Sequence, residues 1–228
     1  MFAYGNKHYF CIVNFLSHYY FDSKPDQAYF NLGLIFPDIV RNFVRGSKLD
    51  LTIKIDDAHL QHDLLMGCIQ HVQSDKTFHA WIGFHDTMDF VTQRIRMSEH
   101  DIDKDWFIAH ILVELAMDHY LLNQHTELAN KLYTDFGNVD TAQVHSFLGR
   151  NDFSKFDSFQ NGFDQFMNVR YLESYTKADN IVYALGRICT KMNLKPFTEL
   201  QKQLIKSIIF DLNSKMPQLV SDLKVELK

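Results

Sequence analysis

The chain has 228 residues, a formal net charge of −5, 46% hydrophobic and 22% charged residues, and only nine Gly and four Pro. This composition argues against disorder and against a β fold with many turns, and it favours a compact helical protein. The acidic balance gives no support to a general nucleic-acid binder, which would carry a surplus of Lys and Arg. We therefore expect a single all-α domain without a nucleic-acid partner.

The cysteines and the N-terminus bear on the cellular compartment. Cys11, Cys68 and Cys189 are odd in number, far apart and set among apolar residues, so we expect free thiols in a reducing environment. The first residues contain no uninterrupted apolar run flanked by basic residues, so no signal peptide is expected. No stretch approaches the length of a membrane span. The sequence thus predicts a soluble, cytoplasmic protein.

The predicted elements begin with an irregular lead-in over residues 1–13, followed by one helical domain over residues 14–228. Apolar periodicity and turn residues place the boundaries, with proline near helix starts and glycine near helix ends. Helices are expected over residues 14–21, 38–45, 57–97 in two pieces, 101–136, 141–148, 163–174, 177–192 and 196–215. Residues 27–35 are apolar enough to be buried, whereas residues 47–56 and 151–162 are expected to be polar connections.

A stripe of polar side chains occurs within the predicted helix around residue 75. His71, Asp75 and His79 recur every fourth residue, which places them on one face of a helix. Cys68 and Val72 border this stripe, so we expect it to face the interior. Histidine and carboxylate groups at this spacing are typical of a metal site.

A second stripe occurs on the next long helix. His110, Glu114 and Asp118 also recur every fourth residue, in a helix that is apolar on nearly every side. A buried carboxylate must be paired or must bind a metal, because a bare buried charge costs several kcal/mol or more. Two facing helices with such stripes predict a metal site between core helices.

Spacing alone does not separate ligands from ordinary helix pairs. Five histidines are followed by an acid four residues later, where roughly 1.5 such pairs are expected by accident. His59 with Asp63 and His85 with Asp89 lie in polar surroundings, so we interpret these as solvated surface pairs. The two stripes also fit a buried hydrogen-bonded network without metal. Taken alone, His18 fits a core histidine, Asp38 a helix cap and Arg41 a surface charge.

Several short segments occur in an order that matches a known family. They are Asn14–His18, Gly33–Asp38, Phe43–Gly46, Gly67–His71 with Asp75 and His79, Glu114 with Asp118–Leu121, Tyr171–Tyr175, and Ala184–Arg187. Over about residues 14–190 this order resembles the acyl-carrier-protein phosphodiesterase family. His79 stands where the family has an aspartate.

The resemblance implies an all-α hydrolase that uses a divalent metal, usually manganese. Members of that family cleave the phosphodiester joining 4′-phosphopantetheine to a serine of acyl carrier protein, so it also implies acyl carrier protein as a partner. The site residues that it implies are His18, Asp38, His71, Asp75, Glu114 and Asp118. His79 and the added His110 make the site richer in nitrogen, which favours zinc, iron or manganese over magnesium.

These residues suggest a mechanism with two metal ions. Residues 71 and 79 lie about 12 Å apart along a helix, too far to share one ion. We expect a carboxylate, Asp38 or Asp75, to bridge two ions of manganese, zinc or iron, which together activate a water and polarise the phosphoryl oxygens. Arg41 or Arg45 is expected to hold the phosphate. The expected catalytic residues are therefore Asp38, Asp75 and Arg41.

Two alternatives remain open from the sequence. The spacing pairs and the helical character also resemble the zinc-dependent phospholipase C and nuclease group, which would change the substrate but not the chemistry. The other alternative is a non-catalytic, degenerate family member that keeps the polar cluster for structure.

Overall fold

The computed structural model describes residues 14–44, 46–56 and 60–227, and within these ranges the protein is all-α. The helices are α1 (Phe15–Asp22), α2 (Ala28–Gly33), α3 (Phe36–Phe43), α4 (Leu60–Ala80), α5 (Ile82–Arg96), α6 (Asp105–Gln124), α7 (Leu128–Gly137), α8 (Thr141–Arg150), α9 (Phe156–Val169), the 3₁₀ helix η1 (Tyr171–Thr176), α10 (Ala178–Lys191) and α11 (Glu199–Glu226). No strand is assigned in the described ranges, which confirms the predicted fold class. The lead-in over residues 1–13, with Cys11, lies outside them, as do Arg45 and His59.

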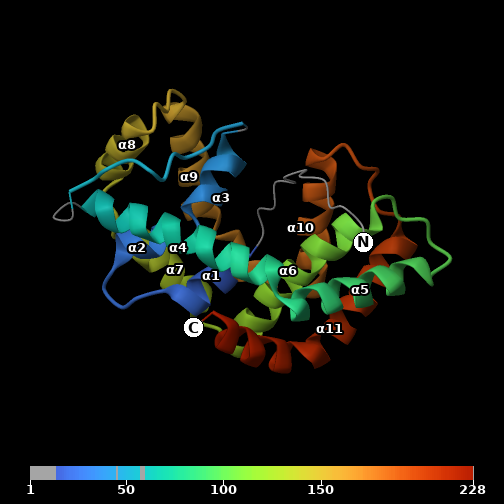
Figure 1. Cartoon of the computed structure of the whole chain (residues 1–228). Helices are drawn as coiled ribbons and strands as arrows, with labels where there is room; N and C mark the ends of the chain where they lie inside the picture. Colours follow the sequence, from blue (N-terminus) through green and yellow to red (C-terminus); the bar gives the residue numbers. More distant parts are fainter. Residues whose placement is uncertain (1–13, 45, 57–59, 228) are drawn as a thin grey trace.

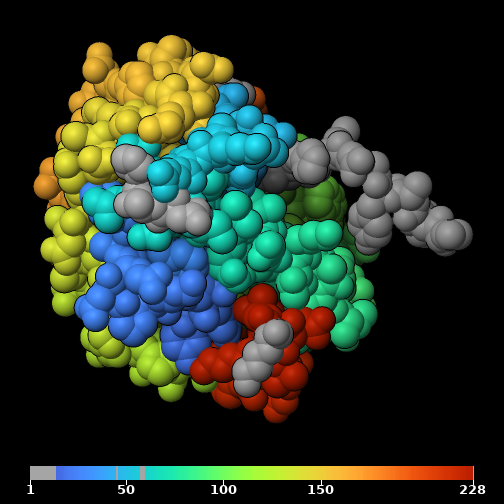
Figure 2. Space-filling view, turned by 60° about the vertical axis from the view of Figure 1, so that its left-hand side comes forward, coloured from blue at the N-terminus to red at the C-terminus, as the bar shows by residue number. Residues whose placement is uncertain are grey.

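The α6 helix lies at the centre of the fold. It packs against α1, α5, α10, α11 and η1, and 14 of its 20 residues are buried. In Figure 1, α4 and α5 cross in front of α6, while α11 runs below it. Figure 2 shows the carboxyl end of α11 against α1. The buried apolar side chains of these helices form one connected core.

The helical segment predicted over residues 57–97 is indeed two helices. The chain leaves helical geometry at Trp81, where ψ is 133°, so α4 ends at Ala80 and α5 begins at Ile82. This break matters for the site, because His79 lies in the last turn of α4 and Phe84 in the first turn of α5.

The helix predicted over residues 101–136 is instead two helices, α6 and α7. No glycine or proline marks the break. The side chain of Asn123 donates hydrogen bonds to the carbonyls of His119 and Thr176, and His125 leaves the helical region with φ −131°. The chain therefore turns because of a tertiary contact with η1, which local sequence patterns do not report.

The loop predicted over residues 151–162 is wrong, because α9 begins at Phe156. Phe159, Phe163 and Phe166 recur at helical spacing and are buried on one face of α9. The polar residues between them concealed this stripe. The helix ends at Val169 because Arg170 takes a left-handed conformation, φ +50°, before η1.

The last helix is longer than predicted and starts later. Thr198 caps it, and its side chain and that of Gln201 form a reciprocal capping box. The helix continues through Pro217 to Glu226 instead of ending near Lys215. No helix in the described part of the chain is both long and apolar enough to cross a membrane.

Two glycines set the position of α4, which carries three of the predicted ligands. A Cβ atom added at Gly67 would lie 2.1 Å from the carbonyl oxygen of Phe30 and 2.8 Å from the Cα of Gly33. These separations are far below van der Waals contact, so α2 and α4 can cross this closely only where both carry glycine. The crossing fixes the axial position of His71, one turn after Gly67 on α4.

Candidate metal centre

The polar stripes of α4 and α6 meet at His79, His110 and Glu114. The Nε2 atom of His79 lies 3.5 Å from Oε1 of Glu114, and Nε2 of His110 lies 3.2 Å from the same oxygen. The two imidazole rings stack with centroids 4.8 Å apart. The potential ligand atoms of these three residues all lie within 4.8 Å of one another, so the group could hold one metal ion.

Asp75 joins this group through His79. Its Oδ1 lies 3.1 Å from Nε2 of His79, and its side chain is 42% exposed. Burial alone would raise the pKa of Asp75, but the hydrogen bond and positive charge of His79 outweigh it and lower that pKa to about 2. Burial likewise acts to lower the pKa of His79, and Asp75 and Glu114 together raise it instead. Asp75 is therefore ionised and available as a ligand.

A second group forms about two turns before His79 on α4, around His71. The backbone carbonyl of Leu34 lies 2.8 Å from Nδ1 of His71, which makes Nδ1–H the donor and leaves Nε2 facing Asp38. Nε2 of His71 and Oδ1 of Asp38 are 3.7 Å apart. The ring of His18, from α1, lies 4.3 Å from that of His71. Three helices thus converge here, α1, α3 and α4, since Asp38 comes from α3.

Asp38 is a buried carboxyl group among other acids. Burial, together with the charges of Asp75 and Glu114, raises its pKa well above the usual range, and Arg41 only partly opposes this. The guanidinium of Arg41 lies 3.7 Å from Oδ1 of Asp38 and is about one-third exposed. Three carboxyl groups that repel one another in a partly dry site are stabilised best by cations.

His18 has an unsatisfied nitrogen. The residue is buried, and its Nε2 atom has no hydrogen-bond partner among the described residues. Burial and the neighbouring His71 lower the pKa of His18 well below 6.5, so the ring is neutral. A neutral, unpartnered imidazole nitrogen suits a metal, although His18 also lines a cavity of about 20 Å³, enough for one water molecule.

Asp118 has a different environment from the other predicted ligands. Its two carboxylate oxygens accept hydrogen bonds from the backbone amides of Leu16 and Ser17 and from the Ser17 hydroxyl, at 2.6–3.1 Å. Asp118 therefore caps the amino end of α1, although it lies about a hundred residues later in the chain. The next residue, His119, accordingly faces away, with Nδ1 donating to the carbonyl of Tyr175 at 2.6 Å.

The remaining expectations from the sequence divide as follows. His85 and Asp89 are exposed, as expected for a surface pair.

Phe84 was not anticipated, although its ring lies 5.0 Å from that of His79 and 5.1 Å from that of His110. No spacing signal could have found it, because it lies beyond the break after α4. Cys68 is free and buried, as predicted.

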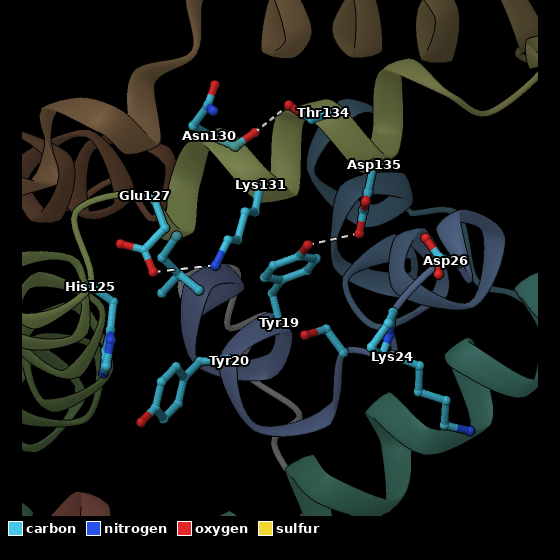
Figure 3. Close-up of a pocket in the computed structure, with 13 residues that line it drawn as sticks. Tyr19, Tyr20, Lys24, Asp26, His125, Glu127, Asn130, Lys131, Thr134 and Asp135 are labelled. Carbon is cyan, nitrogen blue, oxygen red and sulfur yellow. Dashed lines mark hydrogen bonds and ion pairs between the residues drawn. The ribbon is translucent and has the colours of Figure 1, made fainter.

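A separate pocket of about 670 Å³ lies between α1, α7 and the turns that precede α2 and α7. Figure 3 shows Tyr19 and Asp135 on its wall, with the Tyr19 hydroxyl donating to Asp135 at 2.7 Å. Lys131 forms an ion pair with Glu127 at the same wall. None of the predicted metal ligands lines this pocket, although His18 is adjacent to Tyr19 in the chain.

Comparison of the chain with family models, with curated proteins and with solved structures gave no match in any of the three. The resemblance to the acyl-carrier-protein phosphodiesterase family therefore rests on the sequence motifs and their order.

Proposed function

We propose that this protein is a metal-dependent phosphodiester hydrolase with two divalent ions. One ion is assigned to His79, His110 and Glu114, and the second to His18, Asp38 and His71. Asp75 pairs with His79, and its charge also acts on His18, Asp38 and His71, so we assign it as the bridge. By the resemblance of the motifs, the substrate is holo-acyl carrier protein and the product released is 4′-phosphopantetheine.

The observation that carries the proposal is the convergence of Asp38, Asp75 and Glu114 on histidines of one site, since Asp38 lies 3.7 Å from Nε2 of His71, and Asp75 and Glu114 lie 3.1 and 3.5 Å from Nε2 of His79. These acids come from three different helices, yet each of Asp75 and Glu114 raises the pKa of Asp38. A fold that brought three acids together only for structure would lose free energy through this repulsion. Two divalent cations would offset it and would also use the unpartnered Nε2 of His18.

The donor set fits such ions. Imidazole nitrogen with carboxylate oxygen suits manganese, iron and zinc. When bound, two divalent ions would offset the negative charge of the phosphoryl oxygens and would lower the pKa of a water molecule, so that it could act as the nucleophile near neutral pH. The protein contributes orientation, since Leu34 holds the ring of His71 and Phe84 packs on His79 and His110.

Arg41 is assigned to the substrate and not to the metal. Its guanidinium lies at the edge of the centre beside Asp38 and is partly open to solvent. From there it can donate two parallel hydrogen bonds to a phosphate. The phospholipase or nuclease alternative uses the same residues, and hydrolysis of bis-p-nitrophenyl phosphate without hydrolysis of holo-acyl carrier protein would favour it over the carrier-protein assignment.

The first prediction concerns Asp38→Asn. The amide keeps the size of the side chain but removes a negative charge that two cations need. We expect metal content to fall by at least one ion per chain and turnover of bis-p-nitrophenyl phosphate to fall by about a hundredfold or more, with the helical circular dichroism unchanged. Elemental analysis and initial rates with manganese, zinc or iron measure both effects. Arg41→Ala should keep the metal and raise KM.

His100→Ala is the matched control, because this partly exposed histidine lies in the connection between α5 and α6 and is not one of the proposed ligands. It should match the wild type in metal content and rate. If reconstituted wild-type protein hydrolyses neither bis-p-nitrophenyl phosphate nor holo-acyl carrier protein, the enzyme proposal is wrong. The non-catalytic alternative, a buried polar network, then takes its place.

A further inference from the structure

The pocket between α1, α7 and the turns that precede α2 and α7 has a carboxylate on its wall (Figure 3). Its volume of about 670 Å³ is in the usual range for a small-molecule site. Tyr19 and Tyr20 supply aromatic surface, and Pro25 and Leu128 supply apolar surface. Asp135 of α7 lies beside the Tyr19 hydroxyl. The pocket therefore joins aromatic and apolar surface to one oriented carboxylate.

Neutral groups hold Asp135 in place. Its Oδ2 atom accepts hydrogen bonds from the Tyr19 hydroxyl and from Nδ2 of Asn31, both at 2.7 Å. Asn31 is buried, and its side chain also exchanges two hydrogen bonds with the backbone of Lys24, so the orientation of its amide is fixed. Burial and the hydrogen bond to Asp135 raise the pKa of Tyr19, which keeps the hydroxyl protonated as a donor. The fold thus orients this carboxylate without neutralising its charge.

The negative charge of Asp135 has no counter-ion in the described part of the chain. Its Oδ1 atom receives no hydrogen bond, and neither oxygen forms an ion pair with a described Lys, Arg or His side chain. Lys131, one turn before Asp135 on α7, pairs with Glu127 at 3.3 Å instead. The ammonium group of Lys24 lies 3.8 Å from the ring centroid of Phe30 and, in Figure 3, away from Asp135. Asp135 can therefore accept a cation from outside the chain.

The other charges on the wall leave negative charge in surplus. Three acids, Asp26, Glu127 and Asp135, line the pocket together with two lysines. Asp26 is exposed in the turn before α2 and forms no ion pair with a described residue. A ligand with one positive charge would balance the wall, whereas an anion would meet more acids than lysines.

We propose that this pocket binds a small organic amine, with its ammonium group on Asp135 and its apolar body against Tyr19 and Tyr20. The ammonium group would donate a charge-assisted hydrogen bond to Oδ1 of Asp135. Tyrosine rings attract cations at their faces and also cover apolar carbon, so they suit both parts of such a ligand. None of the proposed metal ligands lines the pocket, so this second site does not depend on the hydrolase proposal.

The experiment compares the binding of two molecules of the same shape by NMR titration. Tyramine carries an ammonium group on a phenylethyl chain, and tyrosol carries a hydroxyl group in its place. Wild-type protein should bind tyramine in the millimolar range or more tightly, and about ten- to hundredfold more tightly than tyrosol, the range for a charge-assisted hydrogen bond. The Kd should be the same for manganese-loaded and EDTA-treated protein, because the pocket contains no proposed metal ligand.

Asp135→Asn tests the proposed anchor of the ammonium group. The amide oxygen can still accept both hydrogen bonds, from Tyr19 and Asn31, so the fold should be kept while the charge is lost. Tyramine binding should weaken about tenfold or more, and tyrosol binding should not change. Asp164→Asn is the matched control, because this exposed acid of α9 also accepts a hydrogen bond from a side-chain amide but lies outside the pocket.

Asp26→Asn and Lys131→Gln change the charge of the wall and leave the hydrogen bonds of Asp135 intact. Asparagine tolerates the left-handed conformation of residue 26, φ +58°, so the fold should be kept. Asp26→Asn should weaken tyramine binding, though by less than Asp135→Asn does. Lys131→Gln should strengthen it, because a competing cation is removed. These two variants test the inference even if Asp135→Asn fails to fold.

Different results would overturn the inference. If wild-type protein binds tyramine no more tightly than tyrosol, or not at all, the pocket does not recognise an ammonium group. Weaker tyramine binding by Lys131→Gln would mean that the lysine holds the ligand and that the pocket is an anion site. Loss of tyramine binding on EDTA treatment would place the amine at the metal centre. Absence of phosphodiester hydrolysis would overturn only the proposed function, because this test measures binding alone.

Discussion

At the scale of single residues, Asp75 and Asp118 illustrate how environment assigns different roles to the same side chain. Asp75 is partly exposed and pairs with His79, and its pKa is lowered to about 2, despite burial. Asp118 is fully buried, and burial raises its pKa to about 7 against the three hydrogen bonds from α1 that favour its charged form. The carboxylate of Asp75 can still bind a cation, whereas both oxygens of Asp118 already accept hydrogen bonds from α1.

This difference predicts separate effects for Asp118→Asn and Asp38→Asn. An asparagine at position 118 presents an NH₂ group to amides that need an acceptor, which leaves a buried donor unsatisfied. We expect the free energy of unfolding to fall by about 1–3 kcal/mol, with the metal content retained. Urea denaturation and elemental analysis measure the two quantities.

Ser17→Ala is the control, because it removes only the hydroxyl donor to Asp118 and keeps both backbone donors. It should cost about 0.5–1.5 kcal/mol. A protein with Asp118→Asn that lost its metal without losing stability would show instead that Asp118 is a ligand, as the family resemblance implies.

At the scale of elements, the crossing of α2 and α4 determines where the ligands of α4 lie. Gly67→Ala should force the two helices apart, because the added methyl group would lie 2.1 Å from the Phe30 carbonyl oxygen. Overpacking of this kind costs about 1–3 kcal/mol or more. We expect a lower midpoint of urea denaturation and weaker metal binding, since the shift displaces His71.

Gly149→Ala provides the comparison within another helix, α8. A Cβ atom there would meet only the ring of Phe156, at 3.9 Å, which is ordinary contact. Alanine also favours the helix, by about 0.5–1 kcal/mol over glycine. Equal destabilisation by both substitutions would mean that the close approach of α2 and α4 has no special importance.

The sequence predicted elements well where local signals were strong. Trp81 separates two helices within a predicted pair, and Gly137 ends α7 as expected. The end of α6 was missed, because Asn123 turns the chain through a contact with Thr176, more than fifty residues later. The start of α9 was missed because its phenylalanines alternate with polar residues.

At the scale of the whole molecule, the site depends on contacts between distant segments. Spacing alone indicated the pairs His71/Asp75 and His110/Glu114, since each lies within one helix. Spacing could not show that His79, and not Asp75, is the residue of α4 that reaches Glu114. Nor could spacing show that the first residues of α1 donate hydrogen bonds to Asp118, because that contact joins residues about a hundred positions apart.

The last prediction concerns the stability of the whole molecule with and without metal. In the metal-free protein the pKa of Asp38 is raised, so the unfolded chain releases this proton at a lower pH than the folded chain. The folded state then binds more protons, and stability falls as the pH rises above about 4. The raised pKa of His79 acts in the same direction, because the stability it contributes is lost as the pH rises through that pKa.

A divalent ion replaces these protons, so its stabilising effect should grow with pH and reach about 2.7 kcal/mol at a hundred times Kd. We expect the difference in Tm between manganese-loaded and EDTA-treated protein to be larger at about pH 7.5 than at about pH 5.5. His100→Ala should reproduce this behaviour, whereas His110→Ala should reduce the difference at both pH values. If EDTA leaves Tm unchanged throughout, the cluster is stable without metal, and its acids and histidines form a structural network.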